Sequence, residues 1–158
     1  MKRLALVLIL GSCGYHLVPT DIGDNRSIAI LVAENHSTWR GLESALTLRL
    51  REDVQRRLDI QLAQTSAADL ILRTEISNAS RQALIGDKEG NITVGAATLT
   101  VDWVLTKHSG TKIGEGSLQR NFEFRPNLGE NSDEALRRIA HQVSEVIVME
   151  VHSRLAEI

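Results

Sequence analysis

Side chains that could do chemistry are few in this sequence, and their spacing forms no catalytic motif. It contains five histidines and one cysteine, with neither a His-Glu-x-x-His zinc pattern nor a Gly-x-Ser-x-Gly nucleophile turn. His141 and His152 share one predicted helix and are interpreted as surface residues. Gly114-x-Gly116 opens a predicted strand rather than a helix, so it does not form a phosphate loop. We therefore expect no enzyme activity, no cofactor and no metal site.

The single cysteine is informative because of the residues before it. Lys2 and Arg3 precede an apolar run over residues 4–10, and two small residues then lead to Cys13. A basic start, a short apolar stretch and small residues at the cleavage point are typical of a secretory signal. The run is far shorter than the roughly 20 residues that a membrane-spanning helix needs. Residues 1–12 are therefore predicted to be a signal peptide, and the alternative is a buried N-terminal strand or helix.

The segment Leu10-Gly11-Ser12-Cys13 resembles a lipobox, the cleavage motif of bacterial lipoproteins. The resemblance implies that the Cys13 thiol receives a diacylglycerol and that its new amino group is then acylated. Several acyl chains on one residue give stable membrane anchoring, whereas a single chain binds only marginally. Gly14, rather than an aspartate, follows the cysteine, and this favours the outer membrane over the inner membrane.

Composition and charge indicate one globular domain. The chain has 158 residues, of which 42% are hydrophobic and only 3% aromatic, so the core must consist mainly of aliphatic side chains. Removal of Lys2 and Arg3 with the signal lowers the formal net charge from −2 to −4. This balance argues against a nucleic-acid partner, which would favour a basic excess. We expect residues 13–26 to form a lipid-anchored tether and residues 27–158 to form the domain.

Hydropathy predicts two helices among several strands. Apolar residues recur at three- and four-residue spacing over residues 40–58, and again from Leu136 to Val151. Asn131 is positioned to cap the second helix, with Glu134 three residues later as in a capping box. Strands are expected at residues 27–32, 59–64, 70–78, 98–106 and 113–124, with a loop over 33–39 and a hairpin loop over 86–91.

Alternation along the strands predicts which face of the sheet is buried. In the strand at 98–106 the residues expected to face the core are Leu99, Val101, Trp103 and Leu105. The polar residues expected on the opposite face are Thr98, Thr100, Asp102 and Thr106. Trp103 is interpreted as a packing residue rather than a binding residue. In the first strand the residues expected to share one face are Ile28, Ile30 and Val32.

The order of these elements indicates an α+β fold. The first strand, the first helix and the strand at 59–64 make a crossover, so the two strands should be parallel. Later strands are joined as hairpins, and each helix has one apolar stripe to bury. We therefore predict a two-layer sandwich in which two helices pack on one face of a mixed four- to five-stranded sheet.

Several short motifs occur in order along the chain after the signal. They are Cys13-Gly14-Tyr15-His16-Leu17, Ser27 to Val32 with Glu34-Asn35, Gly41-Leu42-Glu43 with Leu46-Thr47, Ala68-Asp69-Leu70, the loop from Asp87 to Asn91, and Glu134 to Ala140. On these motifs the chain resembles the lipopolysaccharide-assembly lipoprotein family (LptE). The resemblance implies two helices on a four-stranded sheet, seated in the lumen of the outer-membrane β-barrel LptD. It implies the LptD-type barrel and lipopolysaccharide as partners, and a location at the outer membrane.

Three cations are candidates for contact with lipopolysaccharide phosphates or with acidic groups of the barrel: Lys88, Arg120 and Arg125. Lys88 lies in the expected hairpin loop between Asp87 and Glu89, whereas the two arginines come from the last strand and the connection after it. Arginine would bind such groups with a bidentate fork and lysine as a point charge. The alternatives are that all three are ordinary solvated cations, or that the contact lies on the polar face of the sheet.

A second functional class remains open from the sequence. The strand from Ile28 to Val32 followed by Glu34-Asn35 is also similar to curli-secretion and synthase-activator lipoproteins. The alternative function is therefore a periplasmic lipoprotein of the same α/β shape that acts as a regulator or a secretion component.

Overall fold

The computed structural model describes residues 26–157, so the predicted signal peptide and Cys13 lie outside the described residues, as does nearly all of the predicted tether. The elements in chain order are β1 (Ser27–Ile30), β2 (Glu34–Asn35), α1 (Leu42–Arg57), β3 (Gln61–Leu62), β4 (Leu70–Gly86), β5 (Ile92–Lys107), β6 (Lys112–Phe124), the 3-10 helix η1 (Pro126–Leu128) and α2 (Ser132–Leu155).

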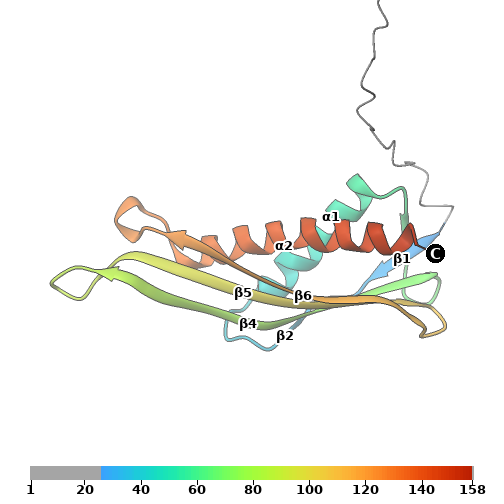
Figure 1. Cartoon of the computed structure of the whole chain (residues 1–158), viewed down its shortest axis with the longest axis horizontal. Helices are drawn as coiled ribbons and strands as arrows, with labels where there is room; N and C mark the ends of the chain where they lie inside the picture. Colours follow the sequence, from blue (N-terminus) through green and yellow to red (C-terminus); the bar gives the residue numbers. More distant parts are fainter. Residues whose placement is uncertain (1–25, 158) are drawn as a thin grey trace, which may run out of the picture.

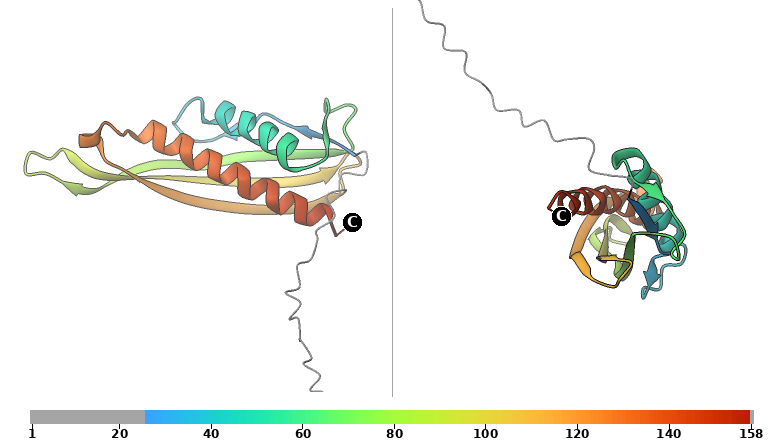
Figure 2. Two further views of the ribbon diagram at one scale, coloured as in Figure 1. Left: turned by 90° about the horizontal axis from the view of Figure 1, so that it is seen from above. Right: turned by 90° about the vertical axis from the view of Figure 1, so that its right-hand side faces the viewer.

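Two helices lie on one face of a mixed sheet and form the predicted two-layer α+β sandwich (Figures 1 and 2). The strand order is β3-β1-β4-β5-β6, and β2 adds a short further strand beside β4. The strand β1 runs parallel to both β3 and β4, which confirms the predicted crossover. The remaining long strands form antiparallel hairpins.

The first strand is shorter and more deeply buried than predicted. Ile28, Ala29 and Ile30 are all at most 5% exposed because β1 lies between β3 and β4. The chain then leaves the sheet, so Val32 is 62% exposed and the prediction that it shares the buried face is wrong. The predicted loop at 33–39 contains a two-residue strand, because Glu34 and Asn35 pair with β4.

The strand β4 continues eight residues beyond the predicted end at residue 78, because β5 pairs with it along almost its whole length. The register shifts between Ile76 and Asn78, which leaves Ser77 as an extra residue in a β-bulge. After the bulge the alternation changes phase, so that Ala79 rather than Asn78 shares the face of the buried Leu99. Sequence alternation alone could not follow the strand through this change.

The core lies between the sheet and the apolar stripes of α1 and α2. The predicted inward residues of β5 are buried: Leu99, Val101, Trp103 and Leu105. The helix α2 begins as predicted, since Asn131 Oδ1 accepts a hydrogen bond from the Glu134 backbone N–H at 2.8 Å. The Glu134 carboxylate pairs with Arg138 at 2.7 Å rather than closing the capping box.

Candidate partner-binding end of the domain

The β4–β5 hairpin reaches past the N-terminal end of α2 and forms one tip of the elongated domain (Figure 1). No residue from Arg81 to Asn91 is buried. The turn itself is ordered: the Asp87 N–H donates to the Asn91 carbonyl at 3.0 Å, and the Asn91 N–H donates to Asp87 Oδ1 at 2.7 Å. Gly90 supplies the positive φ of 84° that this turn requires. The predicted hairpin loop is therefore confirmed.

Hydrogen bonding makes Asp87 the organising residue of the turn. The Asn91 side-chain amide and then the Asn91 backbone N–H hold the pKa of the Asp87 carboxyl below its usual range. Lys88 follows directly and is exposed, with no hydrogen bond or ion pair inside the described part of the chain. The turn thus presents one free cation between the two acidic residues Asp87 and Glu89.

Arg125 lies at the same end of the domain as Lys88. Phe124 pairs with Gly95 in the β5–β6 register, so Arg125 leaves β6 close to where the hairpin begins to project. Its backbone N–H donates to Glu130 Oε2 at 2.8 Å, and its carbonyl accepts from the Leu128 N–H at 3.0 Å. These bonds fold the connection around η1 and leave the Arg125 side chain exposed.

Arg120 does not join the other two cations. It pairs with Leu99 in the register and therefore lies on the helix-facing side of the edge strand β6, where it is exposed. Arg125 is five positions further along the chain, which corresponds to roughly 15 Å along a strand. Its guanidinium Nη1 donates to the Gln119 carbonyl at 3.0 Å. The structure thus brings Lys88 and Arg125 to one end but not Arg120.

Apolar side chains that were not predicted as contact residues are also exposed at this end. Leu84 is 46% exposed, Ile85 is 56% exposed and Leu128 in η1 is 68% exposed. Large apolar side chains exposed at one end of a domain are candidates for an interaction surface. We define residues 84–91 and 125–130 as the contact end. The signal for it was present in the sequence as Leu84-Ile85 beside a turn, but the predicted strand ended before these residues.

The outer face of the sheet, away from the helices, is polar. Two cross-strand rows carry only hydroxyl and amide side chains: Asn78, Thr100 and Gln119 in one, and Ser80, Thr98 and Asn121 in the other. Neither helix covers this face (Figure 2). The predicted polar face is therefore present around Thr98 and Thr100, whereas Thr106 lies in a row with Ile71 and Lys112. This face can meet water or a polar partner.

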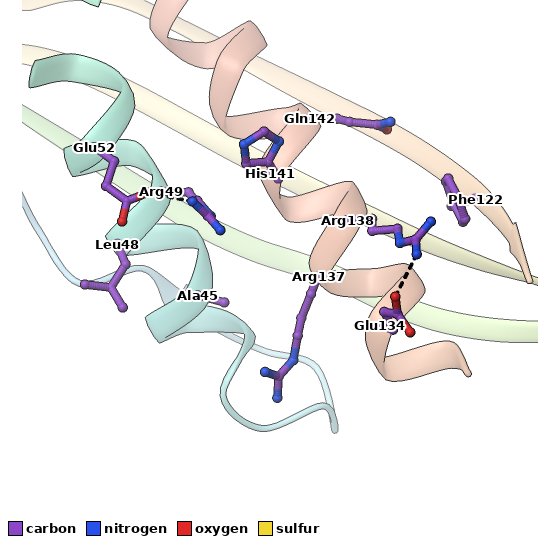
Figure 3. A pocket seen from close by; sticks show the side chains of 10 residues that line it. All are labelled: Ala45, Leu48, Arg49, Glu52, Phe122, Glu134, Arg137, Arg138, His141 and Gln142. Carbon is purple, nitrogen blue, oxygen red and sulfur yellow. Dashed lines mark hydrogen bonds and ion pairs between the residues drawn. The ribbon is translucent and has the colours of Figure 1, made fainter. Parts of the chain in front are cut away.

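An open groove of about 660 Å³ separates α1 from the N-terminal half of α2 (Figure 3). Leu48 and Phe122 supply its apolar wall, and arginines also line it. Arg49 pairs with Glu52 at 2.6 Å and Arg138 with Glu134 at 2.7 Å, which leaves each of these two charges neutralised. The groove is consequently only weakly basic.

A family model described as LptE, lipopolysaccharide-assembly, matches residues 26–151, which is most of the chain. The chain belongs to the LptE lipopolysaccharide-assembly family. The resemblance noted from short sequence motifs is thereby confirmed, and the matched segment spans the whole sheet and nearly all of α2. No curated protein sequence matches this LptE-family chain.

Solved structures share the fold of this LptE-family domain at low sequence identity. Protein CT253 from Chlamydia trachomatis superposes with a TM-score of 0.61 at 10% identity, over 85% of this chain and 99% of that one. A PelC dodecamer from Paraburkholderia phytofirmans superposes with a TM-score of 0.55 at 12% sequence identity, over 84% of this chain and 89% of that one. Lipoprotein GNA1162 from Neisseria meningitidis superposes with a TM-score of 0.51 at 12% sequence identity, over 80% of this chain and 98% of that one. These likenesses establish the fold alone.

Neither helix of the LptE-family domain could cross a bilayer, since within residues 26–157 none combines the necessary length with sufficient hydrophobicity.

Proposed function

We propose that this chain is an outer-membrane lipoprotein that partners an LptD-type β-barrel and assists the assembly of lipopolysaccharide at the cell surface. The observation that carries the proposal is the LptE family match over residues 26–151. The lipid anchor would be Cys13, because the lipobox-like segment Leu10-Gly11-Ser12-Cys13 precedes the matched region. The role is binding and assembly rather than catalysis.

The contact end fits an amphiphilic anion. Lipopolysaccharide combines phosphate groups with acyl chains, and the contact end combines Lys88 and Arg125 with exposed Leu84, Ile85 and Leu128. Guanidinium and ammonium groups would meet phosphate, while the apolar side chains would meet acyl chains or an apolar part of the barrel wall. Arg120 is set back on β6 and would contribute to a barrel contact rather than to the same ligand.

The polar outer face fits the interior of a transmembrane barrel. Lumen-facing positions of such barrels are polar, and the rows containing Thr98 and Thr100 offer both hydrogen-bond donors and acceptors. Because these rows are uncharged, a lumen contact would avoid the large cost of desolvating ions.

Co-purification tests this proposal. The full chain with a C-terminal tag should capture one barrel protein from detergent-solubilised envelopes, and mass spectrometry should identify it as LptD-like. Depletion of the chain should reduce the barrel and the surface lipopolysaccharide together. A tagged double variant that lacks the apolar contact, Leu84→Ser with Leu128→Ser, should capture less barrel than the wild type. A barrel at normal level with normal surface lipopolysaccharide after depletion would reject the assembly role.

The alternative is a periplasmic lipoprotein of similar fold that acts as a regulator or a secretion component. It is favoured by the solved structures, in which the same fold occurs in a lipoprotein and in a PelC dodecamer. The mass of the purified full chain in detergent distinguishes the two. A ring of identical chains with no bound barrel supports the alternative, whereas a one-to-one complex with a barrel supports the assembly role.

A further inference from the structure

Three potential metal ligands converge where β2 pairs with β4. Glu34 and Glu75 are partners in the parallel register, and the His36 N–H donates to the Ile76 carbonyl at 3.0 Å. His36 Nε2 lies 3.3 Å from Glu75 Oε1 and 3.9 Å from Glu34 Oε2. All three ligand atoms lie within 4.8 Å of one another.

The charge around these residues is unbalanced. Asp102 of β5 lies opposite Glu75 in the antiparallel register. Three carboxylates therefore occupy one row across β2, β4 and β5. Like charges directly opposite each other on neighbouring strands are destabilising. Within residues 26–157, His36 is the only partner that forms an ion pair with Glu34 or Glu75. Arg73, two residues earlier on β4, forms no ion pair with this row.

The donor set matches zinc in both chemistry and spacing. Zinc binds imidazole nitrogen at about 2.0–2.1 Å and carboxylate oxygen at about 2.0–2.2 Å, usually with tetrahedral geometry. Two such ligands are then about 3.4 Å apart, close to the 3.3 Å between His36 Nε2 and Glu75 Oε1. Calcium and magnesium prefer oxygen ligands only, so the imidazole selects against them. We propose that Glu34, His36 and Glu75 bind one zinc ion, with a fourth position open to solvent.

The backbone around His36 is held in place by its neighbour Asn35. The Asn35 amide donates to the Trp39 carbonyl at 2.8 Å and to Glu43 Oε2 at 2.7 Å, and its oxygen accepts from the Ser37 N–H at 2.9 Å. The three ligand side chains are exposed, so an ion can enter. Bound zinc would then fasten the segment between β1 and α1 to the centre of the sheet.

Calorimetric titration of zinc chloride into the full chain, purified in detergent without a polyhistidine tag, tests the site. The expected result is one zinc ion per chain. Each of His36→Gln, Glu34→Gln and Glu75→Gln should weaken binding at least about tenfold, since each removes one direct ligand. His152→Gln, which alters a histidine on α2, is the matched control and should bind zinc as the wild type does.

Thermal unfolding supplies a second readout that separates binding from folding. The three ligand side chains are exposed, so the metal-free variants should melt close to the metal-free wild type. Added zinc should raise the melting temperature of the wild type and of His152→Gln but not that of His36→Gln. The proposal is overturned if the wild type binds no zinc, or if His36→Gln keeps its affinity. It is equally overturned if both glutamate variants bind as tightly as the wild type, because the imidazole would then act alone.

Discussion

Gly116 of β6 lies directly opposite Trp103 of β5, and the indole ring occupies the space that a side chain at Gly116 would fill. A Cβ atom at this position would lie 2.6 Å from Trp103 Nε1 and 3.2 Å from Glu150 Oε2. The indole N–H donates to that same Glu150 oxygen at 3.0 Å, which ties the sheet to α2. The Gly114-x-Gly116 pattern, which forms no phosphate loop, therefore makes room for the tryptophan.

We expect Gly116→Ala to destabilise the fold by about 1–3 kcal/mol, the usual cost of forcing extra volume into a packed core. The added methyl group must displace the ring or break its hydrogen bond to Glu150. Chemical denaturation of the full chain measures the change. Ser117→Ala, on the opposite and exposed side of β6, is the control and should shift stability very little. Equal stabilities for the two variants would contradict the packing account.

Ser144→Ala should loosen the contact between the two helices. Ser144 Oγ donates to Asp53 Oδ2 at 2.7 Å, and the Asp53 side chain is 1% exposed. Hydrogen bonds to buried charged groups contribute about 1.5–3 kcal/mol, so a loss of that size is expected in the free energy of unfolding. Ser153→Ala, on the exposed side of the same helix, should leave the unfolding midpoint nearly unchanged. A Ser144→Ala protein as stable as Ser153→Ala would show that Asp53 finds a substitute donor.

The hairpin turn should loosen in acid. Its Asn91 hydrogen bonds lower the pKa of Asp87 in the folded chain, so ionised Asp87 stabilises the turn at pH values above about 3.9, its ordinary pKa. That stabilisation is lost as the pH falls below this value and through the folded pKa. In an NMR titration the Asn91 amide signal should therefore move with a midpoint below about 3.9. Asp87→Asn is the control and should remove this transition; a midpoint above the ordinary value would contradict the hydrogen bonding.

Cys13→Ser should abolish lipid attachment, because only a thiol forms the thioether that the lipobox-like segment implies. Metabolic labelling with palmitate should mark the wild type and leave the variant unmarked, with the uncut precursor accumulating. Ser12→Gly retains a small residue before the cleavage point and should be labelled normally. Labelling of Cys13→Ser at the wild-type level would show that the segment is not a lipobox.

Lipopolysaccharide binding should depend on the two cations that share the contact end. The double variant Lys88→Ser with Arg125→Ser should bind lipopolysaccharide more weakly at low salt by up to about thirtyfold, since each exposed charge contributes up to about 1 kcal/mol. High salt should remove the difference, since screening shortens to about 3 Å at 1 M. Arg120→Ser alone should have a smaller effect, and adding it to the double variant should change little. Binding that ignores both salt and these substitutions would place the contact on the outer sheet face around Thr98, Thr100 and Thr106.

Local patterns in the sequence were sufficient for the elements and for the buried side of most of them. Alternation from Leu99 to Leu105 assigned the core face of β5, and three- and four-residue spacing assigned the stripes of both helices. Asn131 marked the start of α2 because a side-chain cap acts within one helical turn. Each of these features depends on neighbours a few residues away, so a single sequence contains it.

Tertiary structure alone decided how distant segments align. The Ser77 bulge and the full length of β4 follow from pairing with β5, and that register brings Lys88 and Arg125 to one end while leaving Arg120 behind. Glu34 and His36 meet Glu75 only because β2 pairs with β4 across some forty residues of chain. Cross-strand register is set by the packing of the whole core rather than by local propensity, so no periodicity in the sequence reports it.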